Sequence, residues 1–198
     1  MPKLAANLSF LFTELPFLDR FEATRAEFVT WRASLPQQSG PLPVSDRLRD
    51  HLPQDRINLN VARRFARWRF CRVPRADEWR YAFTEGGTYD FPWSDTLRNS
   101  DTLANTGRLG LGRTTLVGSF ASGSASPIGP FDLLGNVAEW TADGNLRGGG
   151  YDAPQLQLRC AGRFSPSVDH TPGPSYGFRC CADATPEPAS ERQEGEKK

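Results

Sequence analysis

The chain has 198 residues, which is enough for one domain with a substantial hydrophobic core. Its 24 Lys and Arg residues nearly balance 23 Asp and Glu residues, so the charge of +1 gives no reason to expect nucleic acid or an anionic membrane as a partner. It has no apolar run of the roughly 20 residues that span a bilayer, and its four unevenly spaced cysteines do not suit a disulfide scaffold. We therefore expect a cytoplasmic monomer with reduced thiols.

Three helices are predicted in the first half of the chain. Apolar side chains recur with a helical period in residues 23–31, 58–70 and 76–83, and the second helix turns Arg63, Arg64 and Arg67 outward. The Pro-rich stretch 36–53 predicts a long loop with room for one helical turn at 46–51. The third helix follows Arg75, which cannot accept backbone N–H bonds as Thr does, so its start is expected to be weak.

The second half of the chain has no helical period. Short apolar segments alternate there with Gly, Ser, Asn and Thr, and four of them predict strands: 115–120, 146–151, 156–160 and 177–181. Helices early and irregular strands late indicate an α+β domain. A polar tail at 184–198 follows, which we expect to be disordered.

Six motifs occur in order along the chain. They lie at residues 21–28, 65–82, 91–95, 104–120, 129–143 and 147–180, and they include Phe-Pro-Trp-Ser-Asp, Gly-Asn-Val-Ala-Glu-Trp and Arg-Gly-Gly-Gly-Tyr. This series resembles the formylglycine-generating enzyme family, also called sulfatase-modifying factors. The resemblance implies the formylglycine-generating-enzyme-like variant of the C-type lectin fold, rich in irregular loops. It covers residues 18–183, where we place the domain, after an N-terminal extension at 1–17.

The resemblance also implies an activity whose reactive residues are missing here. Active members carry two cysteines that bind copper(I), a soft metal suited to sulfur, and use oxygen to convert a cysteine of a sulfatase peptide to formylglycine. The two positions fall at Ala153 and about Gln155, and neither residue can ligate copper. Copper is therefore not expected. Cys160, the nearest thiol, matches a structural cysteine of the family.

The remaining thiols are expected to be structural. Cys160, Cys180 and Cys181 are predicted to be small buried hydrophobes, and Cys71 an unpaired thiol at a helix end.

A structural calcium site is implied by the same resemblance. Its ligands would be the carboxylates of Asp132 and Glu139 and the backbone carbonyls of Gly135 and Val137, which are hard oxygen donors. The alternative is a turn residue at Asp132 and a hydrogen-bonded Glu139. A second family site would use Asn105 with an acidic residue that is missing from 107–112.

Arg163, Arg179 and Trp140 are the candidate binding residues. They could line a groove for a peptide or protein partner, and the alternative is that the arginines form internal salt bridges and stack on aromatic rings. His51 and His170 lie in predicted loops, with no nucleophile and carboxylate to complete a catalytic set.

The sequence predicts a non-catalytic family member that serves as a peptide-binding, protein-binding or structural module. One alternative is a formylglycine-generating-type oxidoreductase with relocated chemistry at Cys160 or an iron site. Another rests on residues 1–23, which resemble the start of hydroxypyruvate isomerase, a (β/α)8 barrel, and would make the chain an isomerase fragment. The simpler interpretation of that segment is an edge strand leading into the first helix.

Overall fold

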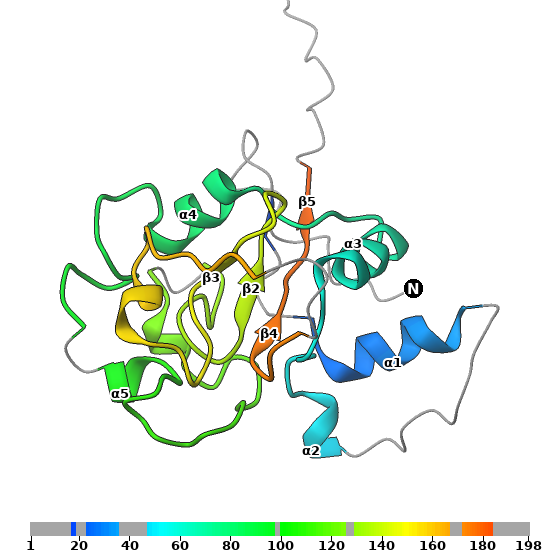
Figure 1. The fold of residues 1–198 in the computed structure, drawn as a ribbon, viewed down its shortest axis with the longest axis horizontal. Helices are drawn as coiled ribbons and strands as arrows, with labels where there is room; N and C mark the ends of the chain where they lie inside the picture. The colour runs from blue at the N-terminus through cyan, green and yellow to red at the C-terminus, as the bar shows by residue number, and fades with distance from the viewer. Residues whose placement is uncertain are drawn as a thin grey trace, which may run out of the picture.

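The computed structural model describes residues 17–18, 23–35, 47–97, 100–125, 129–166 and 172–183 of the chain. Short helices and strands alternate there with long stretches of irregular backbone (Figure 1), and the predicted α+β class is confirmed. The α-helices are α1 (Arg25–Ala33), α2 (Arg47–Asp50), α3 (Leu59–Trp68), α4 (Ala76–Thr84) and α5 (Ser100–Leu103), and the 3₁₀ helices are η1 (Ala121–Gly123) and η2 (Gln155–Leu158). The strands are β1 (Phe17–Leu18), β2 (Ala138–Trp140), β3 (Leu146–Arg147), β4 (Tyr176–Gly177) and β5 (Cys181–Ala182).

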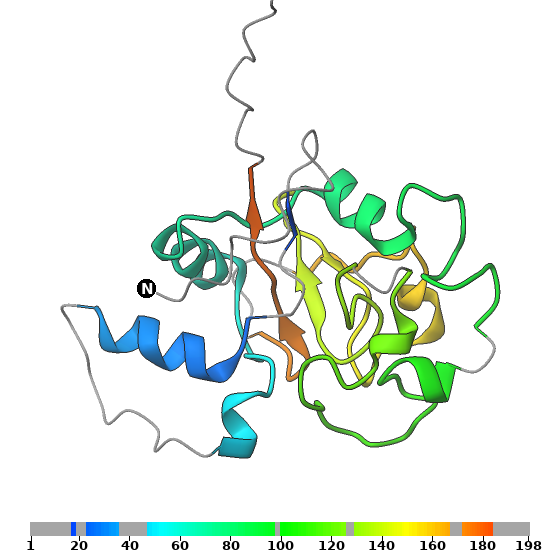
Figure 2. The ribbon, with the colours of Figure 1, turned by 180° about the vertical axis from the view of Figure 1, so that it is seen from behind.

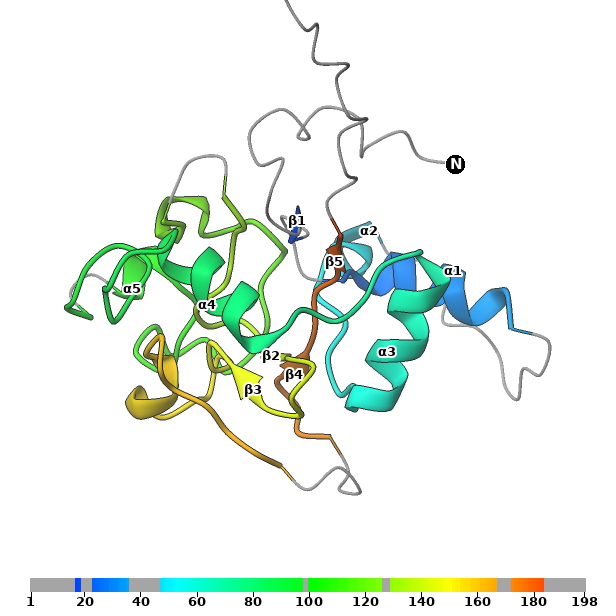
Figure 3. The same ribbon diagram turned by 90° about the horizontal axis from the view of Figure 1, so that it is seen from above.

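The strands form two small sheets. In one, β2 pairs antiparallel with β3 and parallel with β4, and in the other β1 pairs antiparallel with β5. α1, α2 and α3 lie on one side of these strands, and α4, α5 and η2 lie on the other (Figure 1, Figure 2 and Figure 3). Because each strand has only two or three residues, packing between the two helical sides must hold most of the fold.

The helices begin where the sequence provides caps. Thr24 and Glu27 form a reciprocal capping box at α1, with N–H to oxygen distances of 3.3 and 2.9 Å. Asn58 caps α3 with its side-chain oxygen. At α4 the side chain of Arg75 makes no cap, as expected, and only the return bond remains, from the Arg75 N–H to Glu78 Oε2 at 2.8 Å.

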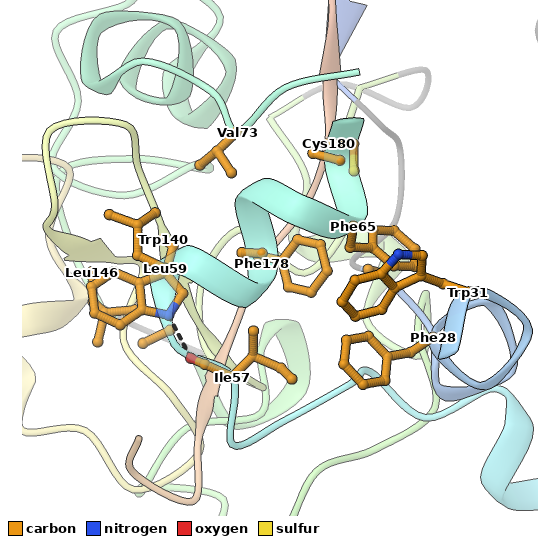
Figure 4. Close-up of a cluster of buried hydrophobic side chains, with 14 residues drawn as sticks. Phe28, Trp31, Ile57, Leu59, Phe65, Val73, Trp140, Leu146, Phe178 and Cys180 are labelled. Carbon is orange, nitrogen blue, oxygen red and sulfur yellow. Dashed lines mark hydrogen bonds between the residues drawn. The ribbon is translucent and has the colours of Figure 1, made fainter. Parts of the chain in front are cut away.

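The first core cluster joins α1 and α3 to the segment that follows β4 (Figure 4). Phe65 is at its centre, fully buried, with its ring 5.7 Å from that of Trp31 and 5.2 Å from that of Phe178. Trp140 enters from β2 and donates its indole N–H to the carbonyl of Ile57 at 2.6 Å. This packing fixes the position of β2 and therefore of the residues around it.

The second core cluster lies under α4. Trp79 and Phe83 stack with ring centroids 4.8 Å apart, and they pack with Phe91, Leu133 and Leu158, all of them buried. The loop before β2 and the helix η2 are thereby attached to α4.

The irregular second half differs from the predicted strands. Residues 115–120 form a turn, 156–160 fall largely in η2, and 177–181 are strand only at their two ends. In 146–151 only the first two residues are extended strand, as β3. Strands this short are defined by their pairing partners, and for β4 and β5 those partners lie far along the chain, so local composition could not locate them.

Some predictions fall outside the described residues. These are the disordered tail at 184–198, the loop assignment of His170, and most of the N-terminal extension. In the parts of the chain that the structure describes, no helix has both the length and the apolar character needed to cross a bilayer.

Candidate functional site

The segment after β3 holds both positions at which the family resemblance places reactive thiols. Gly148 and Gly149 precede it with φ of 78° and 65°, and a Cβ on Gly148 would lie 2.2 Å from the carbonyl oxygen of Leu133. Glycine adopts such a backbone without that clash. The chain therefore bends sharply, Ala153 packs against the second core cluster, and Gln155 begins η2 with an exposed side chain.

A cavity of about 190 Å³ opens beside Ala153. Its wall comes from β2, β3 and β4, from the glycine bend, and from the turn before β4. The lining residues are Ala138, Leu146, Gly149, Gly150, Asp152, Ala153, Pro154, Gln157, Phe164, Gly173, Pro174, Ser175 and Tyr176.

The cavity wall offers two aromatic rings and one carboxylate. The rings of Phe164 and Tyr176 lie with centroids 6.1 Å apart and tilted by 57°. Burial and, next, the negative charge of Asp152 raise the pKa of Tyr176 above its ordinary value. Ser175 and Gln157 add neutral hydrogen-bonding groups. Among these described lining residues there is no thiol or imidazole, and therefore no nucleophile of the family's kind.

The copper site that the family resemblance implies does not fit these residues. Ala153 presents a methyl group and Gln155 an exposed amide where soft thiolates would be needed. Across the described ranges, no group of three or more His, Cys, Asp and Glu residues could hold a metal ion.

A buried ion pair involves β2, the strand that also contributes Ala138 to the cavity wall. Arg179 donates to both oxygens of Glu139, through Nη2 and through Nε at 2.7 Å, and both side chains are completely buried. Trp79 donates its indole N–H to the same carboxylate at 2.8 Å, and Arg179 also donates to the carbonyl of Phe131 at 2.9 Å. This network ties α4, β2 and the segment between β4 and β5 together.

Glu139 and Asp132, the two carboxylates of the predicted calcium site, already have partners within the protein. The Glu139 carboxylate has a guanidinium as its cation, and Asp132 Oδ2 accepts the main-chain N–H of Gly118 at 2.5 Å. Burial raises the pKa of Asp132, although the nearby charge of Arg179 opposes that rise. As placed, the two carboxylates do not fit a shared calcium ion, because the Arg179 guanidinium binds the Glu139 carboxylate and a main-chain N–H binds the Asp132 carboxylate.

The other residues of the two predicted calcium sites form a tight backbone contact. Gly135 has φ of 82°, and a Cβ there would lie 2.3 Å from the carbonyl oxygen of Asn105, which accepts the N–H of Asn136 at 2.8 Å. Val137 is buried. Asn105 Nδ2 donates to the carbonyl of Arg113 at 2.9 Å, while its buried Oδ1 has no hydrogen-bond partner among the described residues. Asn105 therefore supports the loop that precedes β2.

We expect calcium to leave the thermal stability unchanged. A ligand that binds only the folded state must raise the melting temperature, and the carboxylate of Glu139 is already neutralised by Arg179. The measurement is a pair of thermal melts, one with excess calcium and one with chelator, followed by circular dichroism. A melting temperature several degrees higher in calcium would show that the site forms and that the internal ion pair rearranges.

The prediction that Arg163, Arg179 and Trp140 together line a binding groove is wrong. Arg179 and Trp140 are buried, one in the ion pair with Glu139 and the other with its N–H on Ile57, so neither can contact a partner. Only Arg163 is exposed. The alternative, an internal salt bridge, holds for Arg179, whose side chain is completely buried against Glu139.

The residues that line the cavity were not among the predicted binding residues. Asp152 is next to Ala153, one of the two positions where the family resemblance places a thiol, so its position was accessible to sequence reasoning. Phe164 and Tyr176 come from two later segments and meet only in the folded chain. Nothing in their local sequence signals that contact.

Cys180 and Cys181 are buried, whereas Cys71 and Cys160 are partly exposed. Burial and, next, the charge of Glu78 raise the pKa of Cys181 to about 12, so its thiolate form is disfavoured. The backbone N–H of Cys160 bonds to the carbonyl of Asp90 at 2.8 Å, which fits a structural role for that segment.

Comparison with known proteins yields a family match over most of the chain. The family model described as "Sulfatase-modifying factor enzyme 1-like domain" matches residues 16–184. A Mycobacterium tuberculosis protein named "Formylglycine-generating enzyme" is 38% identical over 88 residues, which cover 39% of this chain and 28% of that protein. A Bos taurus protein named "Inactive C-alpha-formylglycine-generating enzyme 2" is 28% identical over 206 residues, which cover 89% of this chain and 67% of that protein. The chain thus spans about a quarter of one relative and two thirds of the other.

The fold is also found in a solved structure. PvdO from Pseudomonas aeruginosa matches with a TM-score of 0.66 at 20% sequence identity, over 85% of this chain and 80% of that one. At this identity the likeness shows the fold alone. The predicted formylglycine-generating-enzyme-like α+β fold is confirmed.

Proposed function

Since this chain belongs to the sulfatase-modifying factor family, we propose that it is a non-catalytic member that binds a peptide segment of another protein. The observation that carries the proposal is the pair Ala153 and Gln155, a methyl group and an exposed amide where the family chemistry requires two thiols. The bovine relative that covers most of this chain is named as inactive, which is compatible with this role.

The cavity beside Ala153 is the proposed binding site. Its carboxylate, Asp152, and its two rings, Phe164 and Tyr176, favour a basic side chain, which can pair with the carboxylate and lie against the rings. The glycine bend and the β2–β4 strand pair hold this wall in place without a ligand, so little ordering cost is expected on binding.

The catalytic half of the proposal is tested by mass spectrometry. The protein is incubated with copper(I), oxygen and a peptide that carries Cys-x-Pro-x-Arg, with an active formylglycine-generating enzyme run in parallel. We expect the peptide cysteine to stay unmodified with this chain. Conversion to formylglycine would overturn the proposal, and its loss in Cys160→Ser would establish the alternative oxidoreductase with relocated chemistry.

The binding half is tested with the same peptide carrying fluorescein. Fluorescence anisotropy should show saturable binding that weakens about tenfold in Asp152→Asn, since a charge-assisted bond is lost. Replacing the peptide arginine by glutamine should weaken binding to the same degree. Asp77→Asn, at an exposed carboxylate on α4 outside the cavity, is the matched control. Binding that is absent, or insensitive to Asp152→Asn, would contradict the proposed site.

A further inference from the structure

Phe70 occupies an unusual place at the end of α3. The N–H of Phe70 bonds to the carbonyl of Arg67 at 3.1 Å, and the N–H of Cys71 bonds to that of Ala66 at 2.8 Å, which together form a Schellman motif. Phe70 is the left-handed residue of that motif, with φ of 58°, where glycine is the usual residue because it has no Cβ.

The ring of Phe70 also gains nothing from the rest of the fold. It is 95% exposed, the most exposed of the large apolar side chains in the described chain. The left-handed backbone is a cost that glycine would avoid, and the solvated ring contributes no burial energy to offset it. Neither the helix end nor the core accounts for a phenylalanine here.

The outer face of α3 beside Phe70 is positively charged. Arg63, Arg64 and Arg67 follow a helical spacing and are all exposed. Arg63 donates to the carbonyl of Ala142 at 2.9 Å, and the guanidinium of Arg64 lies 5.9 Å from the ring centroid of Trp31. Within the described residues, none of the three has a carboxylate at ion-pair distance.

The arginines that come next in the sequence differ in this respect. Arg69 pairs with Glu27, and Arg72 pairs with Glu78 and Asp183. The protein therefore neutralises the arginines at the end of α3 and beyond it, and leaves the charge on the outer face of the helix unpaired.

We propose that this face, formed by Arg63, Arg64, Arg67, Trp68 and Phe70, docks an acidic segment of another protein. Arginine and aromatic side chains are the types enriched in protein interfaces, and an exposed phenylalanine needs an apolar group to cover it. Acidic residues of the partner complement the three unpaired guanidinium groups, and an apolar residue among them covers Phe70. A single-stranded nucleic acid would also use the charges and stack a base on the ring, but the net charge of +1 gives no wider positive field to attract one.

This docking surface is separate from the cavity. No residue of α3 lines the cavity, and α3 lies on the other side of the strands from η2 (Figure 3). The two sites can therefore be tested independently of one another.

The test is fluorescence anisotropy with a labelled, glutamate-rich peptide that carries a central pair of leucines. We expect saturable binding that weakens with salt, and a loss of about tenfold or more in affinity in the double variant Arg63→Gln/Arg67→Gln. Arg108→Gln, an exposed arginine elsewhere on the chain, is the matched control and should leave binding unchanged. The peptide with its leucines replaced by serines should bind more weakly. Absence of peptide binding would overturn the proposal, and so would tighter binding of an oligothymidine of similar length.

Phe70→Gly separates a docking role from a structural one. Because glycine suits the left-handed position, this variant should melt at a higher temperature while its affinity for the peptide falls about tenfold. A fall in melting temperature would show that Phe70 serves the fold. Unchanged peptide affinity would remove Phe70 from the surface.

Discussion

Replacing Arg179 by methionine will lower the free energy of unfolding by about 3–5 kcal/mol, because it leaves the buried carboxylate of Glu139 without a cation. Both side chains are completely buried, so water cannot take over the lost bonds. The indole N–H of Trp79 remains as a donor, but one neutral donor does not replace a bidentate guanidinium. Urea unfolding followed by far-UV circular dichroism measures the loss.

An exposed ion pair of the same chain is the matched control. Arg159 pairs with Asp90 at 3.1 Å, with side chains 47% and 39% exposed, so Arg159→Met should cost less than about 1 kcal/mol. The double variant Arg179→Met/Glu139→Gln removes both charges and should recover part of the loss. If Arg179→Met unfolds no more easily than Arg159→Met, the buried pair does not hold the three segments together.

Replacing Phe65 by alanine will cost about 3–5 kcal/mol of stability, which is typical of truncating a fully buried phenylalanine. Its ring contacts four others, with centroids 6.0 Å from Phe28, 5.7 Å from Trp31, 5.6 Å from Trp68 and 5.2 Å from Phe178. The substitution would remove the packing contacts that join α1 and α3 to the segment after β4. The measurement is again urea unfolding.

The control lies at the end of the same helix. Phe70→Ala removes a ring that is 95% exposed, so the free energy of unfolding should change by no more than about 0.5 kcal/mol. Similar losses in the two variants would mean that Phe70 is covered in solution by part of the same chain, and that would also argue against the docking surface on α3.

The two binding proposals rest on different features of the chain. The cavity depends on the bend at Gly148 and Gly149, which is part of the family motif, whereas the docking surface depends on Phe70 at a helix end. Failure of Asp152→Asn to alter peptide binding would therefore leave the α3 proposal intact.

The helices could be predicted because their signals are local. A helical period of apolar residues places α1, α3 and α4 within two residues of their observed starts, and Thr24 and Asn58 mark two of those starts. Strands of two or three residues carry no comparable signal. β2 and β4 exist because Ala138 and Tyr176, far apart in the sequence, pair in the folded chain.

By itself, the sequence determined the family resemblance and the absence of a thiol at residues 153 and 155, since a position without a thiol stays without one however the chain folds. The identities of Ala153 and Gln155 can be read from the sequence without a structure. Only the tertiary structure decided what the charged residues do. It buries Arg179 against Glu139, a contact between positions 40 residues apart, and it brings Asp152, Phe164 and Tyr176 to one cavity wall. Pairing of this kind depends on which segments pack together, and the spacing of residues along the chain does not encode it.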